Sequence, residues 1–168
     1  MSNHYFKKLS IEFPFFSTNL KGDLVVEHLH PDGTGIAYFK LADTDLQKQI
    51  LNFFKEYNLH DPVITYAEIN ADIWLHRDYN GTVVINYYID TPIARTIFYR
   101  TSAEPYINNA YRPEDCTQVD SFVAESTSTW MLDVSQVHSV EMLNPGIRKF
   151  ISVAFLTHSF EDLLSLLN

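Results

Sequence analysis

Apolar and polar residues alternate along most of this chain in short runs, with the period of two that is typical of half-buried β-strands. Turn-forming residues separate these runs. Aromatic residues make up 14% of the chain, which also suits the broad surfaces of a β-rich fold. The pattern predicts strands at 24–29, 35–41, 64–78, 82–90, 94–100, 128–134, 136–142 and 148–156.

Two segments have a helical pattern instead. In the first, Asp43 or Thr44 is placed to cap a helix, and Thr44 and Gln47 have the spacing of a capping box. Its apolar stripe consists of Leu46, Ile50, Phe53, Phe54 and Tyr57, and we expect that stripe to lie against a sheet. The second segment, SFEDLLSLLN at 159–168, predicts a short closing helix with Ser159 as its cap.

Many short strands with few helices between them indicate an antiparallel sandwich or barrel. The expected fold is mainly β, a double-stranded β-helix (jelly roll) with one or two flanking helices. No repeat, low-complexity tract or linker divides the chain, so one domain is expected over residues 1–168. The long polar segment 101–127 has few strand signals, and we expect it to be a substrate lid.

Composition limits the classes of partner. The net charge of -9 makes nonspecific binding to nucleic acid or to an anionic membrane unlikely. No apolar run approaches the roughly 20 residues that a membrane-spanning helix needs. The single cysteine, Cys116, cannot form an internal disulfide and is expected to be exposed and inert, which points to a reducing, cytoplasmic setting.

Three residues form a candidate metal site. His76 and Asp78 stand two apart near the end of a predicted strand, so their side chains share one face. His138 lies in a later strand and offers a third ligand. Two imidazoles and one carboxylate bind one face of Fe(II) and leave other coordination positions open. A thiolate zinc cluster is excluded because Cys116 is alone.

Arg148 follows His138 at the start of the apolar strand RKFISVAF, where Arg148, Phe150 and Ser152 share a face. An arginine that points inward needs an anion, and its planar guanidinium suits a carboxylate. Ser152 can add a hydroxyl to the same end of the strand. The pair is therefore predicted to hold one end of a dicarboxylate.

The HxD pair, the distant histidine and the arginine ten residues later resemble the Fe(II)/2-oxoglutarate-dependent dioxygenase superfamily over residues 64–156. The resemblance implies Fe(II) held by His76, Asp78 and His138, with 2-oxoglutarate chelating the metal and pairing with Arg148. Asn86, on a neighbouring strand, is a further candidate contact for the cosubstrate. The implied reaction uses O2, releases succinate and CO2, and hydroxylates an unidentified small molecule or protein side chain.

One position departs from the family pattern. Members often carry serine two residues after the arginine, whereas this chain has Phe150 there and Ser152 beyond it. Asp78 argues against halogenase-like members, in which chloride replaces the carboxylate. Two alternatives remain: a cupin-like metalloenzyme without 2-oxoglutarate, and a non-catalytic jelly-roll binding or assembly protein.

His28 and His30 also stand two apart and resemble a cupin HxH pair, but the glycine and glutamate spacing expected around that pair is missing. We therefore expect them to be surface or turn-flanking residues.

Overall fold

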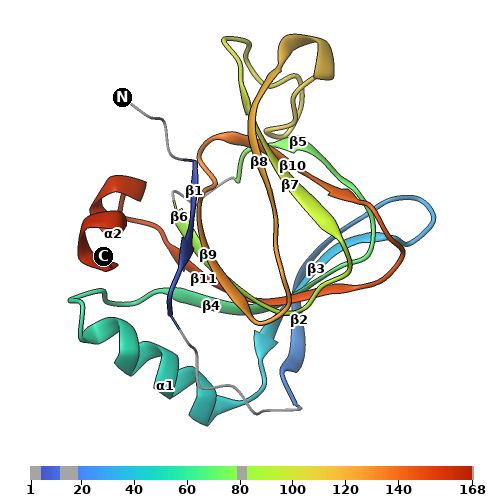
Figure 1. Ribbon diagram of the computed structural model, residues 1–168. Helices are drawn as coiled ribbons and strands as arrows, with labels where there is room; N and C mark the ends of the chain where they lie inside the picture. The colour runs from blue at the N-terminus through green and yellow to red at the C-terminus, as the bar shows by residue number, and fades with distance from the viewer. Residues whose placement is uncertain (1–4, 12–18, 79–82, 168) are drawn as a thin grey trace.

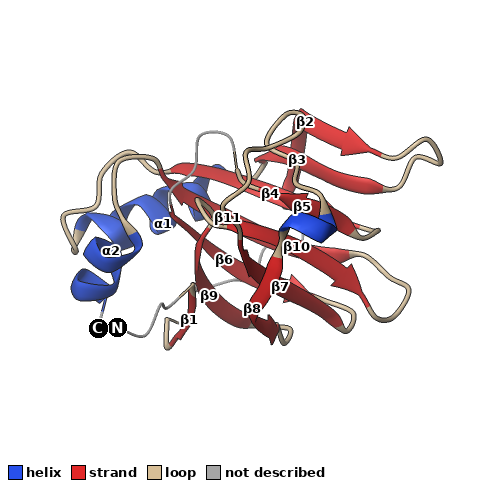
Figure 2. Ribbon diagram, turned by 90° about the horizontal axis from the view of Figure 1, so that it is seen from above, coloured by secondary structure: helices blue, strands red, loops and turns tan. Residues whose placement is uncertain are grey.

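The computed structural model describes residues 5–11, 19–78 and 83–167, and these form three layers (Figure 1, Figure 2). A seven-stranded sheet with the order β1-β9-β6-β11-β4-β3-β2 lies between two helices and a four-stranded sheet with the order β5-β10-β7-β8. From β4 to β11 the chain passes repeatedly between the two antiparallel sheets. This topology confirms the jelly-roll prediction.

The strands of the larger sheet are β1 (Phe6–Leu9), β2 (Lys21–Leu29), β3 (Gly35–Leu41), β4 (Val63–Ile69), β6 (Val83–Asp90), β9 (Ser128–Asp133) and β11 (Arg148–Phe155). The smaller sheet contains β5 (Ile73–His76), β7 (Ala94–Arg100), β8 (Thr117–Val123) and β10 (Val137–Met142). The helices are α1 (Thr44–Lys55), α2 (Phe160–Leu167) and the 3-10 turn η1 (Pro113–Asp115). Thr82 and Asn168, which belong to predicted elements, lie outside the described residues.

Both predicted helices are present, and their caps follow from the sequence. The Asp43 carboxylate accepts hydrogen bonds from the backbone N–H groups of Asp45 and Leu46 at the start of α1. At α2, Ser159 and Asp162 exchange hydrogen bonds between side chain and backbone, as in a capping box. No helix among the described residues is both long and apolar enough to cross a membrane.

The larger sheet has two buried faces. Its outer face packs against α1 and α2 and includes Ile85, Ile151 and Phe155. Its inner face packs against the smaller sheet and includes Tyr88 and Phe150. Because side chains alternate along a strand, each inward residue of β6 and β11 is followed by an outward one.

The predicted single strand at 64–78 is wrong. The structure divides it into β4 and β5, which belong to different sheets. Two polar side chains stabilise the corner between them: Asn70 accepts a hydrogen bond from the N–H of Gly35, and Asp72 accepts one from the N–H of Met142. The polar corner lets the chain leave one sheet and enter the other.

The segment 101–127 is not one irregular loop, contrary to expectation, because β8 occupies Thr117–Val123 and pairs with β7. Part of the remaining loop is also held in place. Tyr111 donates its N–H to the carbonyl of Leu75, and the N–H of Arg77 bonds to the carbonyl of Asn109. Residues 106–111 therefore lie against β5 on the side away from β10. The short strand β1 was also not predicted.

Candidate metal centre

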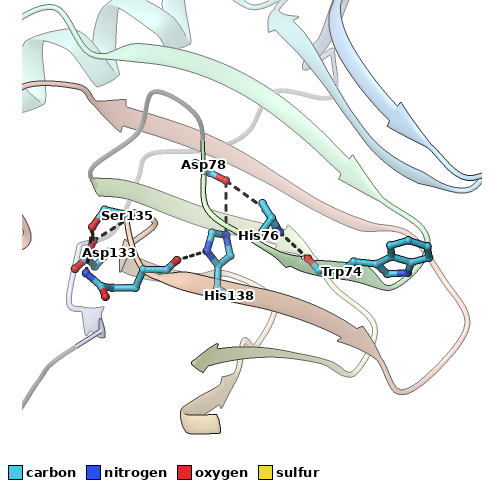
Figure 3. A network of polar contacts seen from close by, with 7 residues as sticks. Trp74, His76, Asp78, Asp133, Ser135 and His138 are labelled. Carbon is cyan, nitrogen blue, oxygen red and sulfur yellow. Dashed lines mark hydrogen bonds and ion pairs between the residues drawn. The ribbon is translucent and has the colours of Figure 1, made fainter. Parts of the chain in front are cut away.

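His76, Asp78 and His138 converge at one end of the smaller sheet (Figure 3). The Nε2 atom of His76 lies 3.3 Å from Oδ1 of Asp78, and Nε2 of His138 lies 3.7 Å from the same oxygen. One candidate ligand atom from each residue falls within 4.8 Å of the others. Among the described residues this is the one group of histidine, cysteine and acidic side chains close enough to hold a metal ion.

The two imidazoles are oriented in the same way. Nδ1 of His76 lies 2.7 Å from the carbonyl oxygen of Trp74, and Nδ1 of His138 lies 2.9 Å from the carbonyl oxygen of Gln136. A carbonyl only accepts hydrogen bonds, so each Nδ1 carries the proton and each Nε2 keeps a free lone pair when the ring is neutral. Histidine ligands in metal sites are commonly oriented by such a bond.

Charge within the group also suits a cation. Burial raises the pKa of Asp78, but the hydrogen bond from His76 and the charges on both histidines outweigh burial and hold that pKa below its usual value. Burial and the neighbouring His76 lower the pKa of His138 to about 4. Burial lowers the pKa of His76, whereas Asp78 raises it, and the net pKa lies above its ordinary value. At neutral pH the group therefore contains an ionised carboxylate and a neutral, buried imidazole.

The backbone fixes the three residues from both sides. His138 on β10 stands opposite His76 on β5, which places the two rings 4.4 Å apart between centroids. The N–H of Asp78 bonds to the carbonyl of Val134, just before β10. The side chains of His76 and Asp78 are 28% and 32% exposed, so a small molecule can reach the group from solvent.

Arg148 lies inside the jelly roll, with 1% of its surface exposed. One guanidinium nitrogen donates to Oγ1 of Thr96 at 3.1 Å, and the guanidinium stacks 4.3 Å from the centroid of Tyr88. Two other nitrogens, Nε and Nη2, are buried without a hydrogen-bond partner. Burial lowers the pKa of the guanidinium, but arginine remains charged. A buried cation with unpaired donors requires an anion.

Arg148 reaches across the interior from β11 in the larger sheet to Thr96 on β7 in the smaller sheet, which also carries the metal group. Its partner Thr96 stands opposite Val140 in the β7–β10 ladder, two residues beyond His138 on the same face. Two residues along a strand correspond to about 7 Å. The residue that accepts a hydrogen bond from Arg148 thus lies on the inner face of the smaller sheet, two residues along from the position opposite His138.

Ser152 and Asn86 both face inward. They stand opposite each other in the β11–β6 ladder, and each is 7% exposed. The amide oxygen of Asn86 is buried and has no hydrogen-bond partner. The sequence did not show which residues of β6 face the interior, whereas the register with β11 assigns Asn86 to the inner face. Both residues therefore offer polar atoms to the interior that also contains Arg148.

Tyr38 is an inward residue that sequence reasoning missed. It lies on β3 opposite Ala67, an interior residue of β4, and packs against the inner core. Burial, together with the charges on Asp78 and Tyr88, raises the pKa of its hydroxyl. Tyr38 thus faces the same interior as Tyr88, on which Arg148 stacks. The apolar alternation of β3 was a signal for its face, but nothing in the sequence indicated its neighbours.

The remaining sequence candidates lie elsewhere. His28 is exposed on β2, and His30 follows that strand, where Nε2 contacts the carbonyl oxygen of Asp72. Cys116 is a free, partly exposed thiol, and burial raises its pKa. A surface groove of about 430 Å³, lined in part by Trp74 and Arg95, does not include the metal group.

No protein-family model matches this chain, and no curated protein does. Solved structures do share its fold. The non-heme α-ketoglutarate-dependent epimerase SnoN from nogalamycin biosynthesis aligns over 78% of this chain and 66% of its own, with 13% identity and a TM-score of 0.54. HygX from Streptomyces hygroscopicus aligns over 89% and 82%, with 12% identity and a TM-score of 0.52.

The Escherichia coli ribosomal oxygenase YcfD aligns over 84% of this chain but 37% of its own length, with 12% identity and a TM-score of 0.52. The chain thus spans less than two thirds of SnoN and of YcfD. At these identities the likenesses show the fold alone. The protein is a jelly roll in which His76, Asp78 and His138 lie close enough together to hold a metal ion.

Proposed function

We propose that this protein is an Fe(II)- and 2-oxoglutarate-dependent dioxygenase that hydroxylates its substrate. The observation that carries the proposal is the combination of a convergent His-Asp-His group at one end of the smaller sheet with a buried guanidinium that reaches from β11 to Thr96 on that sheet and keeps two donors without a partner. Related folds add support, since SnoN was solved with Fe3+ and α-ketoglutarate and HygX with nickel and 2-oxoglutarate.

His76, Asp78 and His138 would hold the metal through the two Nε2 atoms and the carboxylate. Bound Fe(II) would supply the activation of O2, with one oxygen atom entering the substrate as hydroxyl and the other entering succinate as 2-oxoglutarate loses CO2. The residues of the chain itself orient the metal ligands and shield the site. Trp74 and Gln136 keep both imidazoles in the ligating tautomer through their carbonyls.

Arg148 is assigned to the far carboxylate of 2-oxoglutarate. The dicarboxylate would satisfy Nε and Nη2, which are buried without partners in the protein itself. A cupin-like metalloenzyme without 2-oxoglutarate has no use for such a cation, and a binding or assembly protein needs neither the cation nor the metal group. Asn86 and Ser152 are assigned as further polar contacts of the cosubstrate.

The test is the aerobic incubation of the full chain with Fe(II) and labelled 2-oxoglutarate, followed by measurement of succinate. Succinate should form slowly without the primary substrate and should require Fe(II). His76→Ala and His138→Ala should abolish both Fe(II) binding and succinate formation. His30→Ala is the matched control, because its histidine lies outside the metal group, and it should keep both.

Calorimetry with a redox-inert metal tests metal binding and 2-oxoglutarate binding separately. Wild-type protein should bind Mn(II) and then 2-oxoglutarate. Metal binding of full strength in His76→Ala and His138→Ala would remove these residues from the site. Metal binding without any affinity for 2-oxoglutarate would contradict the dioxygenase assignment and favour the cupin-like alternative.

A further inference from the structure

The strand β2 is an edge strand with unusual exposure. Among the described residues it pairs on one side only, with β3. Leu24, Val25, Val26 and Leu29 are between 41% and 54% exposed, so apolar side chains are uncovered on both faces of the strand. Proteins usually protect long apolar edges, because their free N–H and C=O groups bind other strands. Register shifts and the charged residues Lys21 and Asp23 interrupt the first half of this edge, whereas Val26–Leu29 pairs regularly with β3 and is left open, which indicates a binding surface.

The inward face of β2 leads to the metal group. Val26 stands opposite Tyr38 and His28 opposite Ile36, and these β3 residues belong to the inner face of the larger sheet. Residues directly opposite each other share a face. Beyond β2, His30 contacts β5: its ring lies 5.6 Å from that of Trp74.

A strand added to the free edge would lie about 5 Å from β2 and would point alternate side chains inward. The inward positions lie beside Val26 and His28, on the face that Tyr38 and Ile36 continue on β3. An extended polypeptide on this edge therefore presents every second side chain to the inner face, on the side where His30 contacts Trp74 of β5, the strand that also carries His76. A compact small molecule makes no use of a nine-residue backbone edge.

Charge favours one kind of polypeptide. The whole chain has a net charge of -9. On β2, Lys21 is paired with Glu68 at 2.7 Å and Asp23 with Lys40 at 3.8 Å, whereas Glu27 is an exposed acid in the part of the strand that pairs regularly with β3. A second copy of this chain is disfavoured, because it carries the same net charge of -9 and two molecules of like charge repel each other.

We propose that the free edge of β2 binds an extended, basic polypeptide segment by β-strand addition, and that this segment is the substrate whose inward side chain is hydroxylated. The second half of this statement rests on the proposed dioxygenase function. The first half does not, so binding and turnover are measured separately. In turnover, a C–H bond of the peptide becomes C–OH as O2 and 2-oxoglutarate become succinate and CO2.

The probe is a phage-displayed library of random 12-residue peptides, selected on the full chain without added metal. The enriched sequences are made as fluorescent peptides, and their Kd values are measured by anisotropy. We expect peptides of net positive charge with apolar residues at alternate positions. Amide hydrogen exchange should show that bound peptide protects residues of β2, as a newly paired strand requires.

Two proline variants test the backbone directly. Pairing with β3 is regular from Val26 onward, and successive residues in an antiparallel pair direct their N–H groups alternately toward the partner and away from it. Of the two substitutions Val26→Pro and Glu27→Pro, one therefore removes an N–H group that points away from β3. The variant with that substitution should have the melting temperature of the wild type. That variant should bind peptide at least tenfold more weakly. The other variant breaks the ladder with β3 and should melt at a lower temperature.

Matched controls separate backbone pairing from charge and from general surface effects. Val123→Pro alters the edge strand of the smaller sheet, where Val123 is 44% exposed, and should leave the peptide Kd unchanged. Glu27→Gln removes charge but keeps the N–H, and should weaken a basic peptide by about 2- to 5-fold, as for a surface ion pair.

Each outcome decides the proposal. Failure to enrich any peptide, enrichment of acidic peptides, or equal binding by wild type and both proline variants would overturn it. Concentration-dependent dimers that the proline variants abolish would replace the peptide with a second copy. Peptides that bind β2 and raise succinate formation support both halves. Binding at β2 without consumption of 2-oxoglutarate supports the peptide surface and overturns the dioxygenase function instead.

Discussion

The two faces of β11 are both buried, but they are built from different chemistry. The outward residues Ile151, Val153 and Phe155 are apolar and pack beneath α1 and α2. The inward residues include Arg148 and Ser152, which leave polar atoms in the interior. Neighbouring residues on one strand therefore have opposite roles.

The difference between the two faces separates the side chains that stabilise the fold from those that leave polar groups for a ligand. On the outer face each side chain removes apolar surface from water, which stabilises the fold. On the inner face Arg148 is desolvated with two donors unpaired, which costs free energy unless a ligand is bound. We therefore expect outward substitutions to change the free energy of unfolding and inward ones to change ligand affinity.

The largest expected effect is that of Phe155→Ala on the outer face. Phe155 is 2% exposed and its ring contacts that of Phe54 edge-on at 5.2 Å. Truncating a buried phenylalanine costs about 3–5 kcal/mol. The melting temperature should fall by on the order of 10 °C, while the affinity for 2-oxoglutarate below that temperature should not change. Phe155→Leu keeps most of the packing and should lose less stability.

In contrast to Phe155→Ala, Arg148→Met on the inner face should change ligand affinity and not lower stability. Removing one partner of a buried charged pair costs about 2–5 kcal/mol of binding, so the Kd for 2-oxoglutarate should rise roughly 30-fold or more. Metal affinity should remain. The melting temperature of the ligand-free protein should stay the same or rise, because an apolar side chain replaces an unpaired buried charge.

Arg148→Lys keeps the charge but loses the planar fork, and its Kd should lie between those of wild type and Arg148→Met. Arg95→Met is the matched control, since Arg95 pairs with Glu141 on the surface at 2.8 Å. A large loss of stability in Arg148→Met with unchanged binding of 2-oxoglutarate would assign Arg148 to the fold rather than to the cosubstrate.

The smallest expected effect is that of Ser152→Ala. A single neutral hydrogen bond contributes about 0.5–1.5 kcal/mol, so the Kd for 2-oxoglutarate should rise about 2- to 12-fold. Ser139→Ala is the control, because Ser139 lies on β10 but its hydroxyl contacts Tyr99 instead of facing the interior. Equal changes in the two variants would remove Ser152 from the cosubstrate site.

Much of the fold was predictable because the signals are local. The Asp43 and Ser159 caps follow from side chains that bond to backbone within three residues. Most strands follow from period-two alternation. The prediction failed at 64–78, where the alternation continues across a corner that Asn70 and Asp72 hold through bonds to distant Gly35 and Met142. It also missed β8, whose polar sequence is strand only because β7 pairs with it.

The candidate site was likewise predictable only in part. The spacing of His76 and Asp78 placed both side chains on one face, and the strand pattern placed Arg148 on the same face as Phe150 and Ser152, because alternation relates residues two apart. His138 joins them only because β10 pairs with β5 in a register that opposes the two histidines.

The sequence by itself determined the residue types and the relative faces within each strand: two imidazoles, a carboxylate and an arginine next to apolar positions. Only the tertiary structure decided which face is the interior, that Tyr38 packs against the inner core, that Asn86 opposes Ser152, and that β2 pairs on one side only within the described part of the chain. The physical reason is the distance along the chain over which each interaction acts. Side-chain alternation and capping act over a few residues, whereas strand order, register and desolvation depend on contacts between segments far apart in the chain.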